Sequence, residues 1–146
     1  MQDDELESLE YEIACLKTCQ HDKIVNMKEV FEMQDKLVII QDCLNGGSLR
    51  EYLDSHQDKL LQEKLIKKIV KQLASALLYL KQHNIVHRDL KPDNIMIVNE
   101  KISSKDYKTV PSIKLIDFGL STILKPGNKS NDPFGSLDYV APEVIR

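Results

Sequence analysis

The segment from Ile85 to Val98 restricts the folding of this 146-residue chain more than any other. It reads Ile-Val-His-Arg-Asp-Leu-Lys-Pro-Asp-Asn-Ile-Met-Ile-Val, so two short apolar runs enclose a polar stretch. Apolar runs of this length are typical of buried strands, and the polar stretch between them is then a loop held in place. Pro92 lacks a backbone N–H and restricts the residue before it, which predicts a fixed loop rather than a helix.

Three side chains of this loop suit the transfer of a phosphoryl group. Asp89 carries a carboxylate that can take a proton from a hydroxyl, and Lys91 carries a cation that can neutralise a phosphate oxygen. Asn94 offers an amide oxygen, which is a ligand for a hard metal ion. Two further short motifs follow along the chain, Asp117-Phe118-Gly119 and Ala141-Pro142-Glu143. The three segments in this order are far more specific than the loop alone.

The octet His87-Arg88-Asp89-Leu90-Lys91-Pro92-Asp93-Asn94 resembles the catalytic loop of eukaryotic protein kinases, and both later motifs occur in that family in the same order. The resemblance implies a serine/threonine protein kinase that uses ATP and Mg²⁺ to phosphorylate a protein substrate. It also implies an α+β fold of the two-lobed kinase type, present in part. Residues 1–41 then belong to the small lobe, 42–47 form the hinge and 48–146 belong to the large lobe.

Composition and charge are those of an ordinary globular domain. The formal net charge is −3, without the basic excess of nucleic-acid-binding proteins, and no apolar run reaches the roughly 18 residues of a membrane span. The acidic start of the chain is unlike a secretory signal, so we expect an intracellular protein, cytoplasmic with the nucleus left open. Cys15, Cys19 and Cys43 have no CxxC spacing, which predicts free thiols. Cys15, Cys19 and His21 lack an evident fourth metal ligand, so we expect them to pack.

The N-terminal part of the chain is predicted to hold one helix and two strands. Residues 4–20 read as an amphipathic helix with acidic residues in its first turn, and 25–31 and 37–41 read as strands. Glu12, taken alone, is a solvated charge on this helix. The helix precedes His21-Asp22-Lys23-Ile24-Val25, however, and the resemblance to kinases then implies that Glu12 forms an ion pair with a strand lysine.

The second strand leads into Asp42-Cys43-Leu44-Asn45-Gly46-Gly47, whose glycines break regular structure. By itself this segment is a plain turn. The resemblance implies a kinase hinge, in which the adenine of ATP bonds to the carbonyl of Asp42 and to the backbone of Leu44, with Gln41 as the gatekeeper. It also places Met96 at the apolar floor beneath the adenine, where a flexible thioether packs well.

Two helices are predicted after the hinge. Ser48 is a predicted cap for a short helix over 49–54. Residues 61–83 form the clearest helix, since its apolar residues recur at spacings of three and four and its lysines lie on the other side. The apolar residues are Leu61, Leu65, Ile69, Leu73, Leu77 and Leu80, and the lysines are Lys64, Lys67, Lys68 and Lys71. We expect the apolar stripe to be core and the lysines to be a solvated face.

The resemblance assigns a role to each residue of the catalytic loop. Asp89 is the base or the group that orients the substrate hydroxyl, and Lys91 contacts the transferred phosphate. Asn94 and Asp117 hold Mg²⁺, Asp117 from the end of a short apolar strand. Ser136, after a glycine, is implied to brace Asp89 and Lys91, and together with Lys91 it indicates a serine or threonine substrate.

Two residues of the loop receive other roles. His87 is predicted to be packed and hydrogen-bonded rather than a ligand. Arg88 is similar to the kinase arginine that receives a phosphorylated residue of the activation segment, here residues 120–135. Asp132 stands where many kinases carry the activating phosphothreonine. We expect its carboxylate to pair with Arg88 without phosphorylation, although more weakly than a phosphate.

Two functions are left open by the sequence. No Gly-x-Gly-x-x-Gly loop and no Val-Ala-Ile-Lys strand precede Glu12, so the phosphate cover and the lysine partner of the family are not expected within this chain. The first function is an active kinase, present here as an incomplete domain, of a calcium/calmodulin-like or an autophagy-kinase-like subgroup. The alternative is a truncated, non-catalytic kinase-like chain that binds a partner. Phosphate transfer that is lost on Asp89→Asn distinguishes the two.

Overall fold

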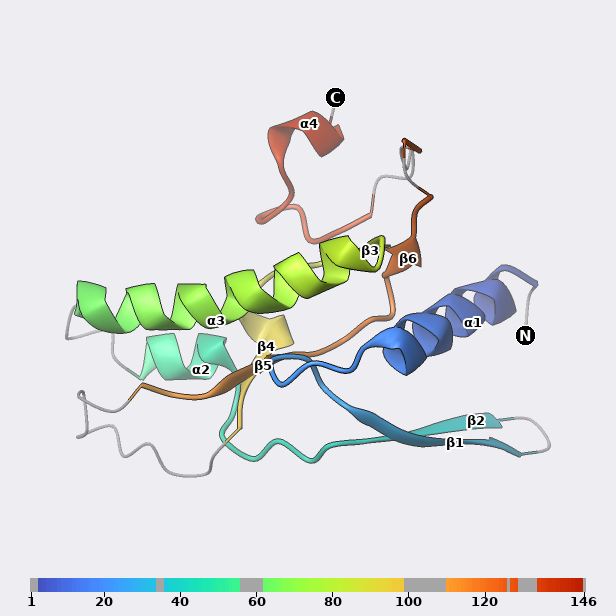
Figure 1. Ribbon diagram of the computed structural model, residues 1–146, viewed down its shortest axis with the longest axis horizontal. Coiled ribbons are helices and arrows are strands. Elements are labelled where there is room, and N and C mark those ends of the chain that lie inside the picture. The colour runs from blue at the N-terminus through green and yellow to red at the C-terminus, as the bar shows by residue number, and fades with distance from the viewer. Residues whose placement is uncertain are drawn as a thin grey trace.

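A computed structural model describes the backbone of residues 3–33, 36–55, 62–98, 110–125, 127–128 and 134–145, and the side chains of these ranges from residue 9 onward. Helices and strands alternate irregularly along the chain, as the predicted α+β class requires. Helix α1 (Asp3–Thr18) lies near the hairpin of β1 (Met27–Met33) and β2 (Lys36–Gln41) at one end of the molecule (Figure 1). The remaining elements are α2 (Leu49–Asp54), α3 (Glu63–Gln82), β3 (Ile85–Val86), a 3₁₀ turn (Pro92–Asn94), β4 (Ile95–Ile97), β5 (Ile113–Leu115), β6 (Thr122–Ile123) and α4 (Pro142–Ile145).

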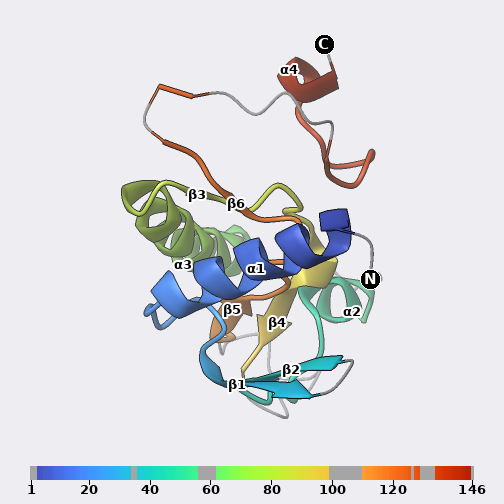
Figure 2. The same ribbon diagram turned by 90° about the vertical axis from the view of Figure 1, so that its right-hand side faces the viewer.

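The described strands form three antiparallel pairs, β1 with β2, β3 with β6 and β4 with β5. Figure 2 shows α1 and α3 beside the central β4–β5 pair, whereas α4 lies further out, at the end of the chain. Because β3 and β4 flank the loop 87–94 and each pairs with a later strand, the two pairs bring residues 116–121 alongside that loop.

The first strand differs from its prediction over 25–31, because it begins at Met27. Residues Ile24 and Val25 instead join the central pair: the N–H of Val25 donates to the carbonyl of Leu115 at 2.9 Å, and Ile24 forms a parallel bridge to the same residue. Both side chains are buried. Because burial in the core favours pairing of these two apolar residues with Leu115, the hairpin strand begins two residues later than predicted.

The predicted packing role of Cys15 and Cys19 is confirmed. Both thiols are free and buried, with 0% and 2% of the residue exposed, and they pack with Leu16, Ile24 and Phe118 in the core. Burial raises the pKa of Cys15 to about 11 and that of Cys19 to about 12. Both side chains are therefore neutral apolar groups at physiological pH.

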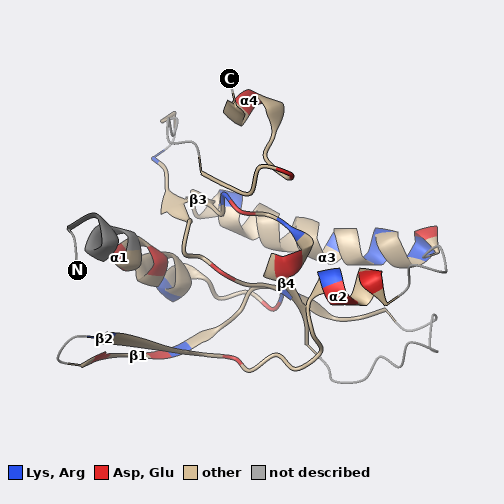
Figure 3. Ribbon diagram, turned by 180° about the vertical axis from the view of Figure 1, so that it is seen from behind, with Lys and Arg blue, Asp and Glu red and all other residues tan. Residues whose placement is uncertain are grey.

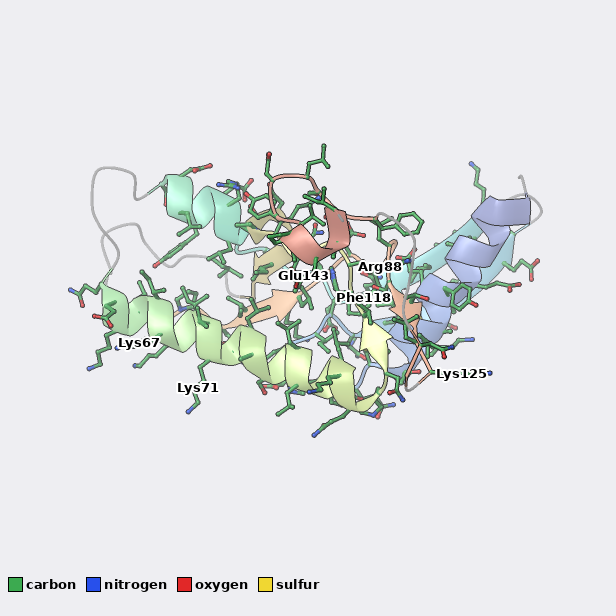
Figure 4. The ribbon with its side chains drawn as sticks, turned by 90° about the horizontal axis from the view of Figure 1, so that it is seen from above. Lys67, Lys71, Arg88, Phe118, Lys125 and Glu143 are labelled. Atoms are coloured by element: carbon green, nitrogen blue, oxygen red, sulfur yellow. The ribbon has the colours of Figure 1, made fainter. Side chains whose placement is uncertain are left out.

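Helix α3 agrees with the predicted stripe. Its buried residues are Leu65, Ile69, Ala76 and Leu80, with Leu73 and Leu77 partly buried; Leu61 lies outside the described residues. The alanine was missed because a small side chain adds little to an apolar pattern. The four lysines are exposed, and Figure 3 shows basic residues recurring along the N-terminal half of this helix. Lys67 and Lys71 both project away from the fold (Figure 4).

The predicted cap of α2 is confirmed and is stronger than expected. The hydroxyl oxygen of Ser48 accepts from the N–H of Glu51 at 3.1 Å, and the Glu51 carboxylate accepts from the N–H of Ser48 at 2.8 Å. This reciprocal pair is a capping box, for which Ser-x-x-Glu is the sequence signal. Among the helices described, none combines the length and the apolar character needed to cross a membrane.

Candidate active site

Asp89 is the centre of a cluster of hydrogen bonds. One carboxylate oxygen, Oδ1, accepts from the hydroxyl of Ser136 at 2.7 Å and from its backbone N–H at 3.1 Å. The other, Oδ2, accepts from the amide of Asn94 at 2.8 Å and lies 2.7 Å from the Nζ of Lys91. Burial by itself raises the pKa of this carboxylate, but the hydrogen bonds that it accepts outweigh burial and lower the pKa to about 2. Asp89 is therefore an anion across the physiological range.

Lys91 lies between two of the predicted site residues. Its ammonium group donates to the hydroxyl of Ser136 at 2.9 Å and forms the ion pair with Asp89. The hydrogen bond to Asp89 raises the pKa of Lys91, and the negative charge of the same carboxylate adds to the effect. The loop and the distant Ser136 thus form one triangle of short polar contacts, as the resemblance implied for their positions.

Asn94 and Asp117 present oxygen atoms next to this triangle. The amide nitrogen of Asn94 donates twice to Asp89, to the backbone carbonyl at 2.9 Å and to the carboxylate, which leaves the amide oxygen as the group available to a cation. Asp117 follows β5 with a φ of 63°, and its carboxylate accepts from the N–H of Gly119 at 3.3 Å. The backbone of Ile116 donates to the Asn94 carbonyl at 2.9 Å, which ties the two segments together.

This donor set fits magnesium better than a transition metal. An amide and a carboxylate oxygen are hard ligands, and Mg²⁺ takes few protein ligands because it also keeps waters and phosphate oxygens. Within the described residues, no three His, Cys, Asp or Glu side chains gather as a cage of their own. The residues present therefore suit a hard cation that takes few ligands from the protein.

Glu12 reaches the same site from α1. A Cβ added to Gly119 would lie 3.9 Å from the Glu12 carboxylate and 3.3 Å from that of Asp117. Burial raises the pKa of Glu12, and the charge of Asp117 raises it further. Among the described residues no lysine or arginine forms an ion pair with Glu12. Both carboxylates thus lie near Gly119, and a cation placed near them would be stabilised.

The predicted hinge is held firmly against β4. The N–H of Gly46 donates to the carbonyl of Ile97 at 3.1 Å, and the N–H of Ile97 donates to Gly47 at 2.9 Å. Ser48 forms a bridge to Met96, which is half-buried in β4. Leu44 is also half-buried. The backbone of residues 46–48 is therefore hydrogen-bonded along β4.

Asp42 has side-chain partners that the sequence reading missed. Its carboxylate lies 2.7 Å from the Nζ of Lys114 on β5 and 2.9 Å from that of Lys28 on β1. The hydrogen bonds from these two lysines lower the pKa of Asp42 to about 2. Its N–H also donates to the carbonyl of Asn26 at 3.0 Å. These ion pairs could not be predicted from local sequence patterns, because the lysines lie 14 and 72 residues away from Asp42 in the chain.

His87 is packed, as predicted. The ring is buried, its Nε2 lies 3.0 Å from the carbonyl of Ile116, and its Nδ1 lies 3.3 Å from the N–H of Asp89. Burial lowers the pKa of His87. The ring of Phe118 meets it edge-on with 5.0 Å between centroids. A neutral imidazole that donates at Nε2 and accepts at Nδ1 satisfies all of these contacts, and it joins the loop to the Asp117-Phe118-Gly119 segment.

A cavity of about 670 Å³ adjoins the loop 87–94, and Asp89 and Ser136 are among the residues that line it. Its walls come from α3, β3 and α4 and include Leu80, Ile85 and Val144. None of Asp42, Leu44 or Met96 lines it. This cavity is therefore separate from the residues predicted to bind the adenine.

Comparison with known proteins agrees with these features. The profile of the protein kinase domain matches residues 1–146. The SNF-related serine/threonine-protein kinase of Rattus norvegicus is 37% identical over 134 residues, which cover 92% of this chain and 17% of the rat protein. Death-associated protein kinase 2 of Mus musculus is 34% identical over 139 residues, which cover 95% of this chain and 35% of the mouse protein.

The chain belongs to the protein kinase domain family. The predicted α+β, kinase-type fold is thereby confirmed. The chain spans 17% of the length of the SNF-related kinase and 35% of that of death-associated protein kinase 2. The first relative is named a serine/threonine-protein kinase and the second a protein kinase. The division into residues 1–41, 42–47 and 48–146 stays a prediction, as do the roles of the individual site residues.

Proposed function

We propose that this chain carries the catalytic centre of a serine/threonine protein kinase, which transfers the γ-phosphate of ATP to a hydroxyl of a protein substrate. The observation that supports this most directly is the set of four hydrogen-bond donors around the Asp89 carboxylate. They hold an anion at a fixed position beside a lysine, which suits a reaction that depends on positioning and charge neutralisation.

Asp89 orients the substrate hydroxyl in this proposal. A carboxylate whose pKa is about 2 is a weak base, so it contributes by accepting a hydrogen bond from the hydroxyl and aiming its oxygen at the phosphorus atom. Lys91 neutralises an oxygen of the transferred phosphoryl group, and Ser136 holds both side chains in register. The hydroxyl passes its proton to the Asp89 carboxylate late, because the acidity of the hydroxyl rises as its oxygen bonds to phosphorus.

ATP and Mg²⁺ are the proposed cofactors. Asn94 and Asp117 would hold the metal ion, which neutralises negative charge on the phosphate groups during the transfer. The backbone of Asp42 and Leu44 would bind the adenine edge, with Met96 against its face. Glu12 lies close enough to Asp117 to add to the negative potential that attracts a cation.

The partner proposed here is a protein with an accessible serine or threonine. The buried free thiols of Cys15 and Cys19 and the exposed thiol of Cys43 support a reducing compartment, for which we propose the cytoplasm. A non-catalytic chain was the other possibility left open by the sequence. The intact trio Asp89, Asn94 and Asp117 supports catalysis instead.

The test is phosphate transfer from γ-labelled ATP to a serine/threonine protein substrate by the protein as expressed from its own gene. We expect Asp89→Asn to lower the rate by about 10²- to 10⁴-fold, because the anion that orients the hydroxyl is lost. Asp93→Asn is the matched control: it changes the same chemical group in the same loop, at an exposed side chain 3.8 Å from Arg50. Equal rates for Asp89→Asn and wild type would contradict the proposal.

A further inference from the structure

The segment that carries Ser136 lies along the catalytic loop over three consecutive residues. Ser136 binds the Asp89 carboxylate through its hydroxyl and its N–H. Gly135 packs against the carbonyl of Arg88, and the ring of Phe134 lies under the Arg88 guanidinium. Three consecutive residues thus contact two neighbouring residues of the loop, Arg88 and Asp89, and each of the three contacts is of a different physical kind.

The middle contact admits no side chain. Gly135 has a φ of 123°, and a Cβ at this position would lie 2.7 Å from the carbonyl oxygen of Arg88. Arg88 itself has a φ of 67°, an uncommon conformation for a residue with a side chain. Both backbones are therefore held in restricted conformations at the point where they meet, and the side-chain contacts on either side must keep them there.

The contact between Arg88 and Phe134 is the one that the sequence reading did not anticipate. The Cζ of the guanidinium lies 4.3 Å from the centroid of the ring, well inside the distance at which a cation is attracted to an aromatic face. The Nε of Arg88 also donates to the carbonyl of Leu120, at the other end of the same segment. Figure 4 shows Arg88 in the region between α4 and β6. One guanidinium therefore contacts both Leu120 and Phe134.

We propose that Phe134 is a positioning residue, whose ring holds Arg88 and thereby keeps the 134–136 segment and Asp89 aligned without a phosphate on the segment. This inference rests on the proposed function. The resemblance gave Arg88 a phosphorylated partner, with Asp132 as a substitute, and Asp132 lies outside the described residues. The structure gives the guanidinium an aromatic partner two residues before Ser136. A ring is a permanent partner, whereas a phosphate is added and removed.

Two explanations of the Phe134 contact make different predictions. If the ring only fills space, any apolar side chain of similar size keeps the segment in place. If the electrons of the ring attract the guanidinium, tyrosine keeps the contact and leucine does not. Phe31 on β1 offers a matched control, because it is 43% exposed against 41% for Phe134 and lies on the hairpin, away from Arg88.

The experiment compares Phe134→Leu, Phe134→Tyr and Phe31→Leu in the protein as expressed from its own gene. The first readout is the hydrogen exchange rate of the Ser136 amide, which donates to Asp89 and so reports the alignment directly. The second is the split between kcat and KM for phosphate transfer. We expect Phe134→Leu to raise the exchange rate and to lower kcat by about two- to thirtyfold, with KM for ATP unchanged. Phe134→Tyr and Phe31→Leu should match the wild type in both.

A further arm treats the wild-type protein with a phosphatase, and we expect neither exchange nor kcat to change. The inference is overturned if Phe134→Leu and Phe134→Tyr behave alike, if neither alters the exchange of the Ser136 amide, or if the phosphatase raises that exchange more than twofold. Failure of the proposed function is a separate result. A protein that transfers no phosphate would contradict the kinase activity, and the exchange rates would still decide the role of Phe134.

Discussion

The hydroxyl oxygen of Ser136 lies 2.7 Å from the Oδ1 of Asp89, although 47 residues separate the two along the chain. Lys91 donates to the same hydroxyl at 2.9 Å, so one small side chain holds the two charged groups of the loop at a fixed separation. The loop 87–94 is therefore hydrogen-bonded to a segment that returns to it much later in the sequence.

Ser136→Ala removes one donor to Asp89 and the acceptor for Lys91, so we expect kcat to fall by about tenfold, the cost of one hydrogen bond to a charged group. Ser136→Thr keeps the hydroxyl and should keep most of the activity. Initial rates of phosphate transfer at saturating ATP test both. If Ser136→Ala transfers phosphate as fast as the wild type, the hydrogen bonds of the Ser136 hydroxyl do not contribute to catalysis.

Asp42→Asn removes the carboxylate that forms ion pairs with two lysines. We expect the free energy of unfolding of this variant to fall less steeply with decreasing pH than that of the wild type. The pKa of Asp42 is about 2 in the folded chain and about 3.9 in the unfolded chain, so its stabilisation is present above pH 4 and disappears as the pH falls through 2. Unfolding by urea, followed by circular dichroism from pH 7 to pH 2, should show a loss of about 1–2 kcal/mol in the wild type that the variant lacks. The exposed neighbour gives the control, Cys43→Ser, which should follow the wild type. A variant whose stability falls as steeply as that of the wild type contradicts the ion pairs.

Tyr79→Phe should loosen the C-terminal end of α1. The Tyr79 hydroxyl accepts from the N–H of Gln20 at 3.0 Å and donates to the carbonyl of Thr18 at 2.9 Å, so it satisfies backbone groups that the end of the helix leaves open. We expect a loss of about 1–2 kcal/mol in the free energy of unfolding. Tyr11→Phe is the control on the same helix, since Tyr11 is 42% exposed. Thermal unfolding that is equal for the two variants would mean that the contact contributes nothing.

Ser48→Ala should remove the cap of α2 at a cost of about 1 kcal/mol, because the N–H of Glu51 loses its acceptor. Ser48→Asp retains an acceptor oxygen and should retain the stability. Chemical denaturation of both variants measures the difference. An alanine variant that is as stable as the aspartate variant would show that another group satisfies the helix end.

The sequence by itself determined the features that depend on near neighbours in the chain. The periodic stripe of α3, the Ser48 cap and the strand–loop–strand frame around Asp89 all follow from spacings of one to four residues, over which backbone geometry is nearly fixed. The same locality explains the predicted burial of His87. The order of short motifs also indicated the kinase family, which the comparisons confirm.

Only the tertiary structure decided which distant groups meet. Ile24 and Val25 continue a strand pattern, yet they pair with Leu115 because the core offers more burial there than the hairpin does. The lysine partners of Asp42 and the ring beneath Arg88 leave no trace in local spacing. Such contacts depend on how the whole chain closes on itself, because the energy of a pair is gained only when the intervening segments have already been packed into place.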